Sequence, residues 1–231
     1  MILNKEIVIY WSYTDKYQIR AEEPVPMVNN YLKKKVPEEY DYMWCPSFIE
    51  YFKNTYCLKS LFDYKLKFEN NGITSNMHDQ TFYNEIVNLR NYNSRMASFA
   101  FPYIFIAECD DLEMEYMPSM MENNSFNNTA ILIPGQMNIG KYVRPLDCGF
   151  HAKKDEVEIK EDDIYAYVKF KTNKKIVFKR FLWDEELQKE IRSLQITKYR
   201  KHFKPLDWYY KKQQAMKVKE RTIKLINNNL L

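Results

Sequence analysis

The feature that most limits what this chain can fold into is a series of short segments in which apolar and polar residues alternate. In residues 64–68 two lysines separate three apolar residues, and in residues 112–116 two glutamates do the same. A side-chain period of two is that of a strand with one buried face. Aromatic residues make up 16% of the chain, which also favours strands. We therefore expect a mainly β protein, an antiparallel β-sandwich of jelly-roll-like type.

The turns between these segments are polar and poor in glycine. Glycine occurs only 4 times, so the turns must rely on Asn, Asp and Pro. Asn70-Asn71-Gly72 predicts a hairpin that joins residues 64–68 to residues 73–75. Residues 172–175 are expected to turn the chain so that residues 176–178 pair back on the strand before them. The other segments with strand character are residues 6–13, 99–107, 130–133, 156–160 and 164–170.

The end of the chain has a helical pattern instead. Asp184 is a suitable N-cap for a helix that places Leu187, Ile191 and Leu194 on one face. Pro205 suits the first turn of a second helix, which is predicted to run to about residue 226. The 231 residues are therefore interpreted as one domain. Residues 1–183 form its β-rich part, and residues 184–231 form a basic helical segment packed on it or extending from it.

Positive charge is concentrated in this C-terminal segment. Residues 198–224 contain ten Lys or Arg and two acids, a balance of +8, so the rest of a chain with net charge +4 carries 4 − 8 = −4. Aromatic residues are interleaved with the basic ones. This mixture suits docking on another protein or self-association, and it also suits gripping phosphates and stacking bases of a nucleic acid. A third reading is a solvated helix whose aromatic face packs on the body. The residues predicted to contact a partner are Arg200, Lys201, Lys204, Trp208, Lys211 and Lys212.

One segment imitates a phosphate-binding loop. Gly135, Gly140 and Lys141 have the spacing of the first part of that motif and follow a predicted strand. The next position is Tyr142 instead of Ser or Thr, and Pro145 would interrupt the helix that should follow. We expect a turn between strands and no bound nucleotide.

Histidine could support an alternative, an Fe(II)-dependent oxygenase on a β-sandwich, which needs two His and one carboxylate. The weak metal-ligand candidates are His78 and His151. Neither is followed two residues later by an acid, so histidines in loops are the simpler interpretation. The acidic runs at residues 110–111 and 161–163 are expected to be solvated turns. No other motif indicates a cofactor, and none is expected.

The cysteines and the start of the chain bear on its compartment. Cys45, Cys57, Cys109 and Cys148 are scattered and form no CxxC pair, so we expect buried free thiols in a reducing compartment. The first residues lack a signal-peptide pattern, and no run of 18 apolar residues occurs. We expect a protein of the host-cell cytoplasm or of a virion, neither secreted nor bound to a membrane.

Several motifs between residues 42 and 181 carry a family resemblance. They are Trp44-Cys45-Pro46-Ser47-Phe48, Asn54-Thr55-Tyr56, Ile133-Pro134-Gly135, Arg144-Pro145-Leu146-Asp147, Tyr167-Val168-Lys169-Phe170-Lys171-Thr172 and Phe178-Lys179-Arg180-Phe181. In these motifs the chain resembles uncharacterised proteins of tailed bacteriophages and, more distantly, a bacterial family of unknown function. The resemblance implies a β-sandwich and a phage or bacterial origin, but no reaction and no functional residues.

The sequence therefore predicts a phage-type protein that is a non-enzymatic binding or assembly module. The first alternative is the metal-dependent oxygenase. The second alternative is a nucleic-acid-binding protein that uses the basic C-terminal segment.

Overall fold

The computed structural model describes residues 6–14, 18–29, 45–76, 87–99, 103–191 and 204–231. Its strands, in chain order, are β1 (Glu6–Tyr13), β2 (Val25–Pro26), β3 (Thr55–Lys59), β4 (Tyr64–Glu69), β5 (Gly72–Ser75), β6 (Val87–Asn91), β7 (Met96–Phe99), β8 (Tyr103–Ala107), β9 (Glu113–Pro118), β10 (Ala130–Leu132), β11 (Gly135–Asn138), β12 (Cys148–Ala152), β13 (Glu156–Ile159), β14 (Ile164–Phe170) and β15 (Lys175–Arg180). Its helices include η1 (Gln18–Arg20), α2 (Pro46–Tyr51), α4 (Ser125–Thr129), α6 (Leu206–Ala215) and α7 (Val218–Asn228).

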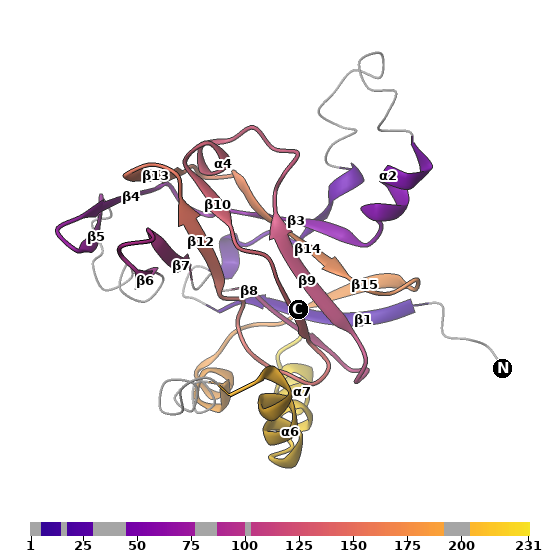
Figure 1. Ribbon diagram of the computed structural model, residues 1–231. Helices are drawn as coiled ribbons and strands as arrows, with labels where there is room; N and C mark the ends of the chain where they lie inside the picture. Colours follow the sequence, from indigo (N-terminus) through magenta and orange to yellow (C-terminus); the bar gives the residue numbers. More distant parts are fainter. Residues whose placement is uncertain (1–5, 15–17, 30–44, 77–86, 100–102, 192–203) are drawn as a thin grey trace.

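Within the described residues the strands form four sheets. Their strand orders are β15-β1-β8, β10-β12-β7-β6, β11-β9-β14-β3-β2 and β13-β4-β5. All neighbouring strands are antiparallel except β1 and β15. The predicted mainly β class, with antiparallel sheets and helices near the C-terminus, is confirmed (Figure 1).

The hairpin around Gly72 forms as predicted. Strand β4 pairs with β5, and Glu69 lies opposite Gly72 in the register. Asn70 and Asn71 between them have φ values of 51° and 60°. Two successive residues with positive φ fit the right-handed twist of the flanking strands, and asparagine tolerates this conformation better than most residues.

Strand β15 does not pair back on β14, so that prediction was wrong. Both edges of β14 are already occupied, one by β3 and the other by β9. Strand β15 instead pairs in parallel with β1, with Phe178 opposite Ile9. The Phe178 ring packs 4.9 Å from the ring of Tyr56 and 5.9 Å from the ring of Phe170, measured between ring centroids. Through Phe178, β15 thus packs on the sheet that contains β3 and β14.

Residues 99–107 do not form the single buried strand that the sequence predicted. Strand β7 ends at Phe99 and belongs to the sheet with β12, whereas β8 begins at Tyr103 and pairs with β1. Each strand nevertheless supplies the core. The ring centroids of Phe99 and Phe150 are 4.6 Å apart, and those of Phe105 and Phe170 are 5.6 Å apart. One apolar cluster joins the four sheets and contains these four rings.

The C-terminal helices gather at one end of the strands (yellow in Figure 1). The predicted helix after Asp184 is confirmed for residues 185–191, and the Leu187 N–H donates a 2.8 Å hydrogen bond to Asp184 Oδ1. Leu187 and Ile191 are buried in a second apolar cluster together with Ile106 of β8. None of the described helices is both long and apolar enough to cross a bilayer.

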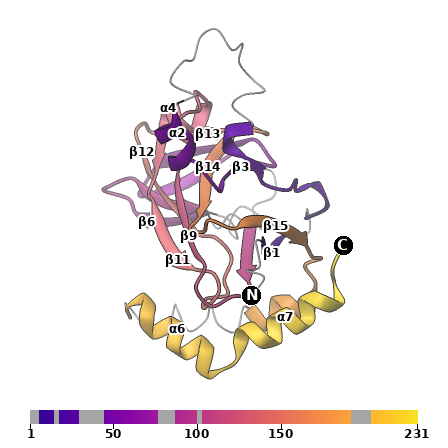
Figure 2. The same ribbon diagram turned by 90° about the vertical axis from the view of Figure 1, so that its right-hand side faces the viewer.

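The single helix predicted from Pro205 to about residue 226 is wrong. Two helices, α6 and α7, are separated by a bend at which Lys217 has a φ of 50° (Figure 2). A straight helix would continue in one direction, whereas the bend lets each helix contact a different part of the body. Gln213 of α6 reaches Val143, and Lys219 of α7 reaches Glu108.

The segment that imitates a phosphate-binding loop is a strand followed by a turn, so the expected turn is confirmed only for residues 139–141. Gly135 begins β11, and irregular backbone follows Gly140 where the motif requires a helix. Gly140 has a packing role instead. A Cβ atom at this position would lie 1.9 Å from the backbone oxygen of Cys109, closer than any two non-bonded atoms can approach.

We predict that Gly140→Ala destabilises the protein by about 2–3 kcal/mol, because the backbone of Cys109 must move to admit the methyl group. Urea unfolding measures the loss. Gly72→Ala is the matched control, since its nearest contact would be 3.7 Å from Glu69 O, and its effect should stay within about 0.5 kcal/mol. Equal effects of the two changes would contradict the close approach at Gly140.

Candidate partner-binding surface

Helix α6 is attached to the body by its polar side chains as well as its aromatic ones. The side-chain amide of Gln213 accepts a hydrogen bond from Val143 N–H at 2.7 Å and donates one to Val143 O at 3.1 Å. Gln213 is 5% exposed and Val143 is fully buried. Both backbone groups of Val143 lie outside any strand, so the amide supplies the two partners that a neighbouring strand would otherwise supply.

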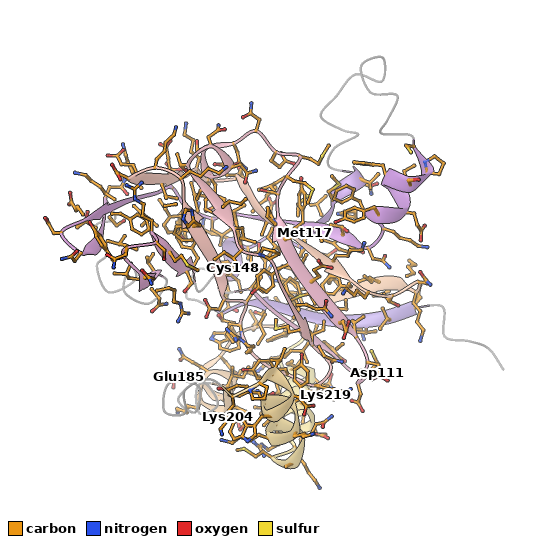
Figure 3. All side chains as sticks on the ribbon, in the orientation of Figure 1. Asp111, Met117, Cys148, Glu185, Lys204 and Lys219 are labelled. Atoms are coloured by element: carbon orange, nitrogen blue, oxygen red, sulfur yellow. The ribbon has the colours of Figure 1, made fainter. Side chains whose placement is uncertain are left out.

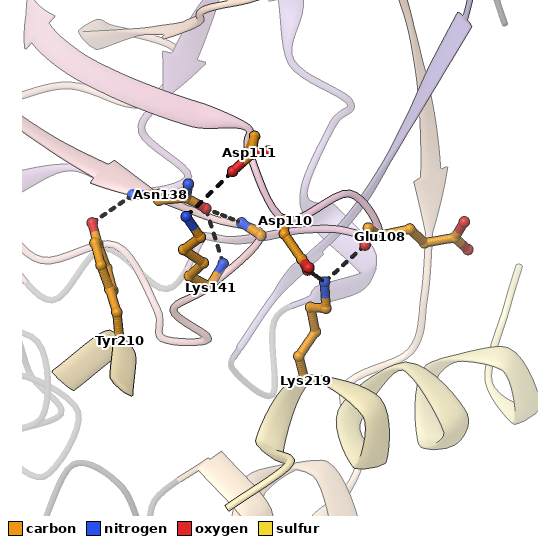
Figure 4. Close-up of polar contacts among 8 residues, drawn as sticks. Glu108, Asp110, Asp111, Asn138, Lys141, Tyr210 and Lys219 are labelled. Atoms are coloured by element: carbon orange, nitrogen blue, oxygen red, sulfur yellow. Dashed lines mark hydrogen bonds and ion pairs between the residues drawn. The ribbon is translucent and has the colours of Figure 1, made fainter. Parts of the chain in front are cut away.

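The next contact along α6 is aromatic. The backbone N–H of Asn138 donates a 2.7 Å hydrogen bond to the hydroxyl oxygen of Tyr210 (Figure 4). The ring of Tyr142 contacts the rings of Tyr209 and Tyr210 at centroid distances of 6.0 and 5.8 Å. The aromatic face of α6 therefore packs on the body, as one of the three sequence interpretations proposed.

The loop on which α6 packs, residues 138–143, is held by hydrogen bonds and an ion pair of its own. Asn138 Oδ1 accepts hydrogen bonds from the N–H groups of Gly140 and Lys141, each 2.9 Å long. The Lys141 ammonium lies 3.2 Å from a carboxylate oxygen of Asp111, across the turn that follows β8 (Figure 4). These bonds fix the loop independently of the helix.

Two basic residues of α7 hold that helix in place. The Lys219 ammonium pairs with the Asp110 carboxylate and donates a 2.8 Å hydrogen bond to Glu108 O (Figure 4). Arg221 Nε donates a 2.9 Å hydrogen bond to Glu190 in the helix of residues 185–191. The side chain of Lys219 is only 16% exposed, so its ion pair is partly shielded from solvent. Part of the positive charge of the segment is thus used inside the molecule.

The outward side of α6 carries the predicted contact residues that the structure describes. Lys204, just before α6, is exposed (Figure 3). The Lys211 ammonium pairs with Asp207 at 2.8 Å, and the hydrogen bond and charge of that carboxylate raise the lysine pKa. The Lys212 ammonium lies 5.2 Å from the ring centroid of Trp208, within cation–π distance. These side chains form a mixed basic and aromatic surface, which we call the α6 outer face: Lys204, Asp207, Trp208, Lys211 and Lys212.

Two of the six predicted contact residues, Arg200 and Lys201, lie outside the described residues. The residues that orient the surface were missed by the sequence analysis, which assigned no role to Tyr209, Tyr210 or Gln213 individually. The 3.6-residue period was the available signal, because residues 209 and 213 are one turn apart and residues 208 and 212 form the next row.

The sequence analysis expected the two acidic runs to be solvated turns, but their carboxylates also form ion pairs. Asp110 and Asp111 pair with Lys219 and Lys141. In the second turn, Glu161 pairs with Arg20, and Asp162 lies 3.7 Å from the ammonium of Lys59. Their position in turns is confirmed, but each run bridges separate parts of the chain.

Of the two metal-ligand candidates, only His151 lies in the part of the chain that the structure describes. His151 is exposed on β12, opposite Ile131 of β10. His78 lies outside the described residues. Over the described ranges, no three His, Cys, Asp or Glu side chains are grouped closely enough to hold a metal ion. A site that joins His78 and His151 remains a prediction.

The four cysteines are free, but only two of them are buried, so the expectation of buried thiols was wrong for the other two. Cys57 and Cys148 are buried, and Cys45 and Cys109 are exposed. Burial raises the pKa of Cys148. At Cys45 the backbone N–H groups of Phe48 and then Ser47 stabilise the thiolate and lower the pKa.

No family model and no curated protein matches this chain.

We predict that Gln213→Ala lowers the free energy of unfolding by about 2–3 kcal/mol, because it leaves Val143 N–H and C=O buried without partners. Gln214→Ala is the control on the next residue, which is exposed, and should change stability by less than about 0.5 kcal/mol. Chemical denaturation of the two variants provides the comparison. If Gln213→Ala were as stable as Gln214→Ala, the amide would not hold α6.

We also predict that Cys45 is alkylated by iodoacetamide faster than the thiol of a short unstructured peptide at pH 7. A lowered pKa means that a larger fraction of Cys45 is thiolate below the usual thiol pKa, and the thiolate is the nucleophile. The advantage should disappear as the pH rises above about 9, where ordinary thiols also ionise. Mass spectrometry over a time course measures alkylation of Cys45 and of the reference peptide in one sample. A ratio independent of pH would refute the assignment.

Proposed function

We propose that the protein is a non-enzymatic binding or assembly module whose α6 outer face docks on an acidic surface of another protein. The observation that carries this proposal is the division of α6 into two sides. Gln213 and Tyr210 hold one side against the body, and Lys204, Trp208 and Lys212 remain on the other. A docked helix presents these groups in a fixed arrangement, which lowers the entropy cost of binding.

The charge pattern favours a protein partner over a nucleic acid. Asp207 lies within the α6 outer face and is paired with Lys211, so a row of phosphates would meet a carboxylate there, whereas a mainly acidic protein surface can also place a hydrogen-bond donor opposite it. Lys219 and Arg221 are engaged with acids of the chain itself. Tryptophan is enriched at the centre of protein interfaces, and the charged residues around Trp208 are typical of the polar rim of such an interface.

The origin, location and fold type of the protein are part of the same proposal. The resemblance to tailed-bacteriophage proteins supports a phage origin and a place in the host cytoplasm or in a virion. The alternating pattern of the strands supports a jelly-roll-like sandwich. The oxygenase alternative has the weaker support, because it depends on His78 and His151 meeting at one ion.

The test uses two probes, a fluorescent poly-L-glutamate peptide and a 20-nucleotide oligothymidylate. Wild-type protein should bind the acidic peptide, and replacing Lys204, Lys211 and Lys212 together with Gln should weaken binding about 10-fold, at about 0.5 kcal/mol for each exposed charge pair. Fluorescence anisotropy at low and moderate salt measures both affinities.

The matched control replaces Lys53, Lys65 and Lys67 with Gln, which removes the same charge from exposed positions elsewhere. This variant should bind as wild type does. Equal weakening in both triple variants would show that net charge alone attracts the peptide. Tighter binding of the oligonucleotide, lost in Trp208→Ala, would replace the proposal with the nucleic-acid alternative.

A further inference from the structure

A cavity of about 160 Å³ lies away from the C-terminal helices, between the chain that follows η1 and the strand β3. The turn between β13 and β14 closes another side of it. The residues that line it are Arg20, Glu22, Glu23, Val25, Cys57, Lys59, Ser60, Leu61, Tyr103, Glu161 and Asp162. An engineered apolar cavity of about 150 Å³ binds benzene, so this volume suits a ligand of about six to eight heavy atoms.

Two polar residues of the cavity lining are almost fully buried, Ser60 and Tyr103, and the Ser60 hydroxyl already donates a hydrogen bond to Phe62 O. Tyr103 is 2% exposed, and no hydrogen bond joins its hydroxyl to any residue in the described ranges. The ring is held by Trp11, Tyr13 and Phe105, whose centroids lie 6.2, 5.2 and 6.1 Å away. Burial and then the charge of Glu22 raise the pKa of Tyr103, so the hydroxyl stays protonated. A buried hydroxyl that lines a cavity without a partner is suited to a ligand.

The rim of the cavity has an excess of negative charge. Four carboxylates, at positions 22, 23, 161 and 162, face two cations, so the formal balance is 2 − 4 = −2. Both cations are already engaged: Arg20 pairs with Glu161, and the Lys59 ammonium lies 3.0 Å from Glu22. Burial by itself lowers the pKa of Lys59, but Glu22 and Asp162 outweigh it and hold the pKa above its ordinary value.

Glu23 is the carboxylate of the cavity rim whose charge is not compensated. Among the described residues it has no basic partner, and it lines the cavity beside Glu22. The ammonium of Lys59 pairs with the carboxylates of Glu22 and Asp162, at 3.0 and 3.7 Å, and therefore does not neutralise Glu23. The position nearest to Glu22 and Glu23 is thus the one where an added positive charge is most stabilised.

We propose that this cavity binds a small organic cation, a primary ammonium on a compact apolar body. The ammonium lies between Glu22 and Glu23 and donates a hydrogen bond to the hydroxyl oxygen of Tyr103. The apolar body contacts Val25 and Leu61. An anion is disfavoured by the rim, and a neutral alcohol leaves the excess negative charge uncompensated. This site is independent of the α6 outer face.

Three probes of the same shape test the proposal: cyclohexylamine, cyclohexanol and cyclohexanecarboxylate. Titrations followed by amide chemical shifts of isotope-labelled protein should show that the amine binds, with shifts at residues 22–25 and 57–61, at least about 5-fold more tightly than the alcohol. The carboxylate should bind most weakly. Equal binding of amine and alcohol, or no shifts with the amine, would overturn the proposal.

Two variants locate the site. Tyr103→Phe keeps the ring and removes only the hydroxyl, and it should weaken amine binding about 3- to 10-fold, the range expected for one hydrogen bond. Glu23→Gln breaks no ion pair of the described structure and should weaken it at least as much. Glu185→Gln removes the same charge from an exposed helix and should have no effect. Binding that survives both cavity changes, or that falls equally in Glu185→Gln, would refute the assignment.

Discussion

The arrangement of the C-terminal segment depends on one buried amide, that of Gln213. It satisfies the N–H and the C=O of Val143, two groups that no strand pairs. Left without partners in the interior, each would cost about 1–3 kcal/mol. The same device occurs where the segment begins: Trp183 N–H donates to Gln18 Oε1 at 2.6 Å, and Gln18 Nε2 donates to Trp183 O at 2.8 Å. Two glutamine amides thus fix the helical segment near its start and at α6.

Because α6 is fixed, its charged side chains have defined positions on the body. The sequence shows only that residues 198–224 are rich in Lys and Arg. The structure separates the described bases into those that hold the helices and those that face outward. Lys219 and Arg221 pair with acids of the chain. Lys212 lies beside Trp208, and Lys204 is exposed just before α6. Exposed pairs such as Lys211–Asp207 contribute little stability, so the position of α6 depends on its inward contacts and not on the outer face.

How much could be read from the sequence depended on whether a feature was local. Strand β1 follows from a run of β-branched and aromatic residues, and the Asn70-Asn71 hairpin follows from alternation and turn chemistry; all of these act over a few residues. The parallel pairing of β15 with β1 could not be predicted, because it depends on β3 and β9 having occupied both edges of β14. The break at Lys217 and the role of Gln213 likewise depend on body residues far away in the sequence. The cavity of Tyr103 was missed for the same reason: its lining comes from four separate segments.

The central claim is that α6 lies on the body with its amide and tyrosine face inward. Hydrogen exchange of individual backbone amides, followed by nuclear magnetic resonance, tests it most directly. The N–H group of Val143 lies outside any strand and donates to Gln213. The N–H group of Asn138, at the end of β11, donates to the Tyr210 hydroxyl of α6. Both should exchange as slowly as the amides of β8. Exchange at the rate of an open loop would contradict the account, because it would mean that α6 does not hold this position in solution.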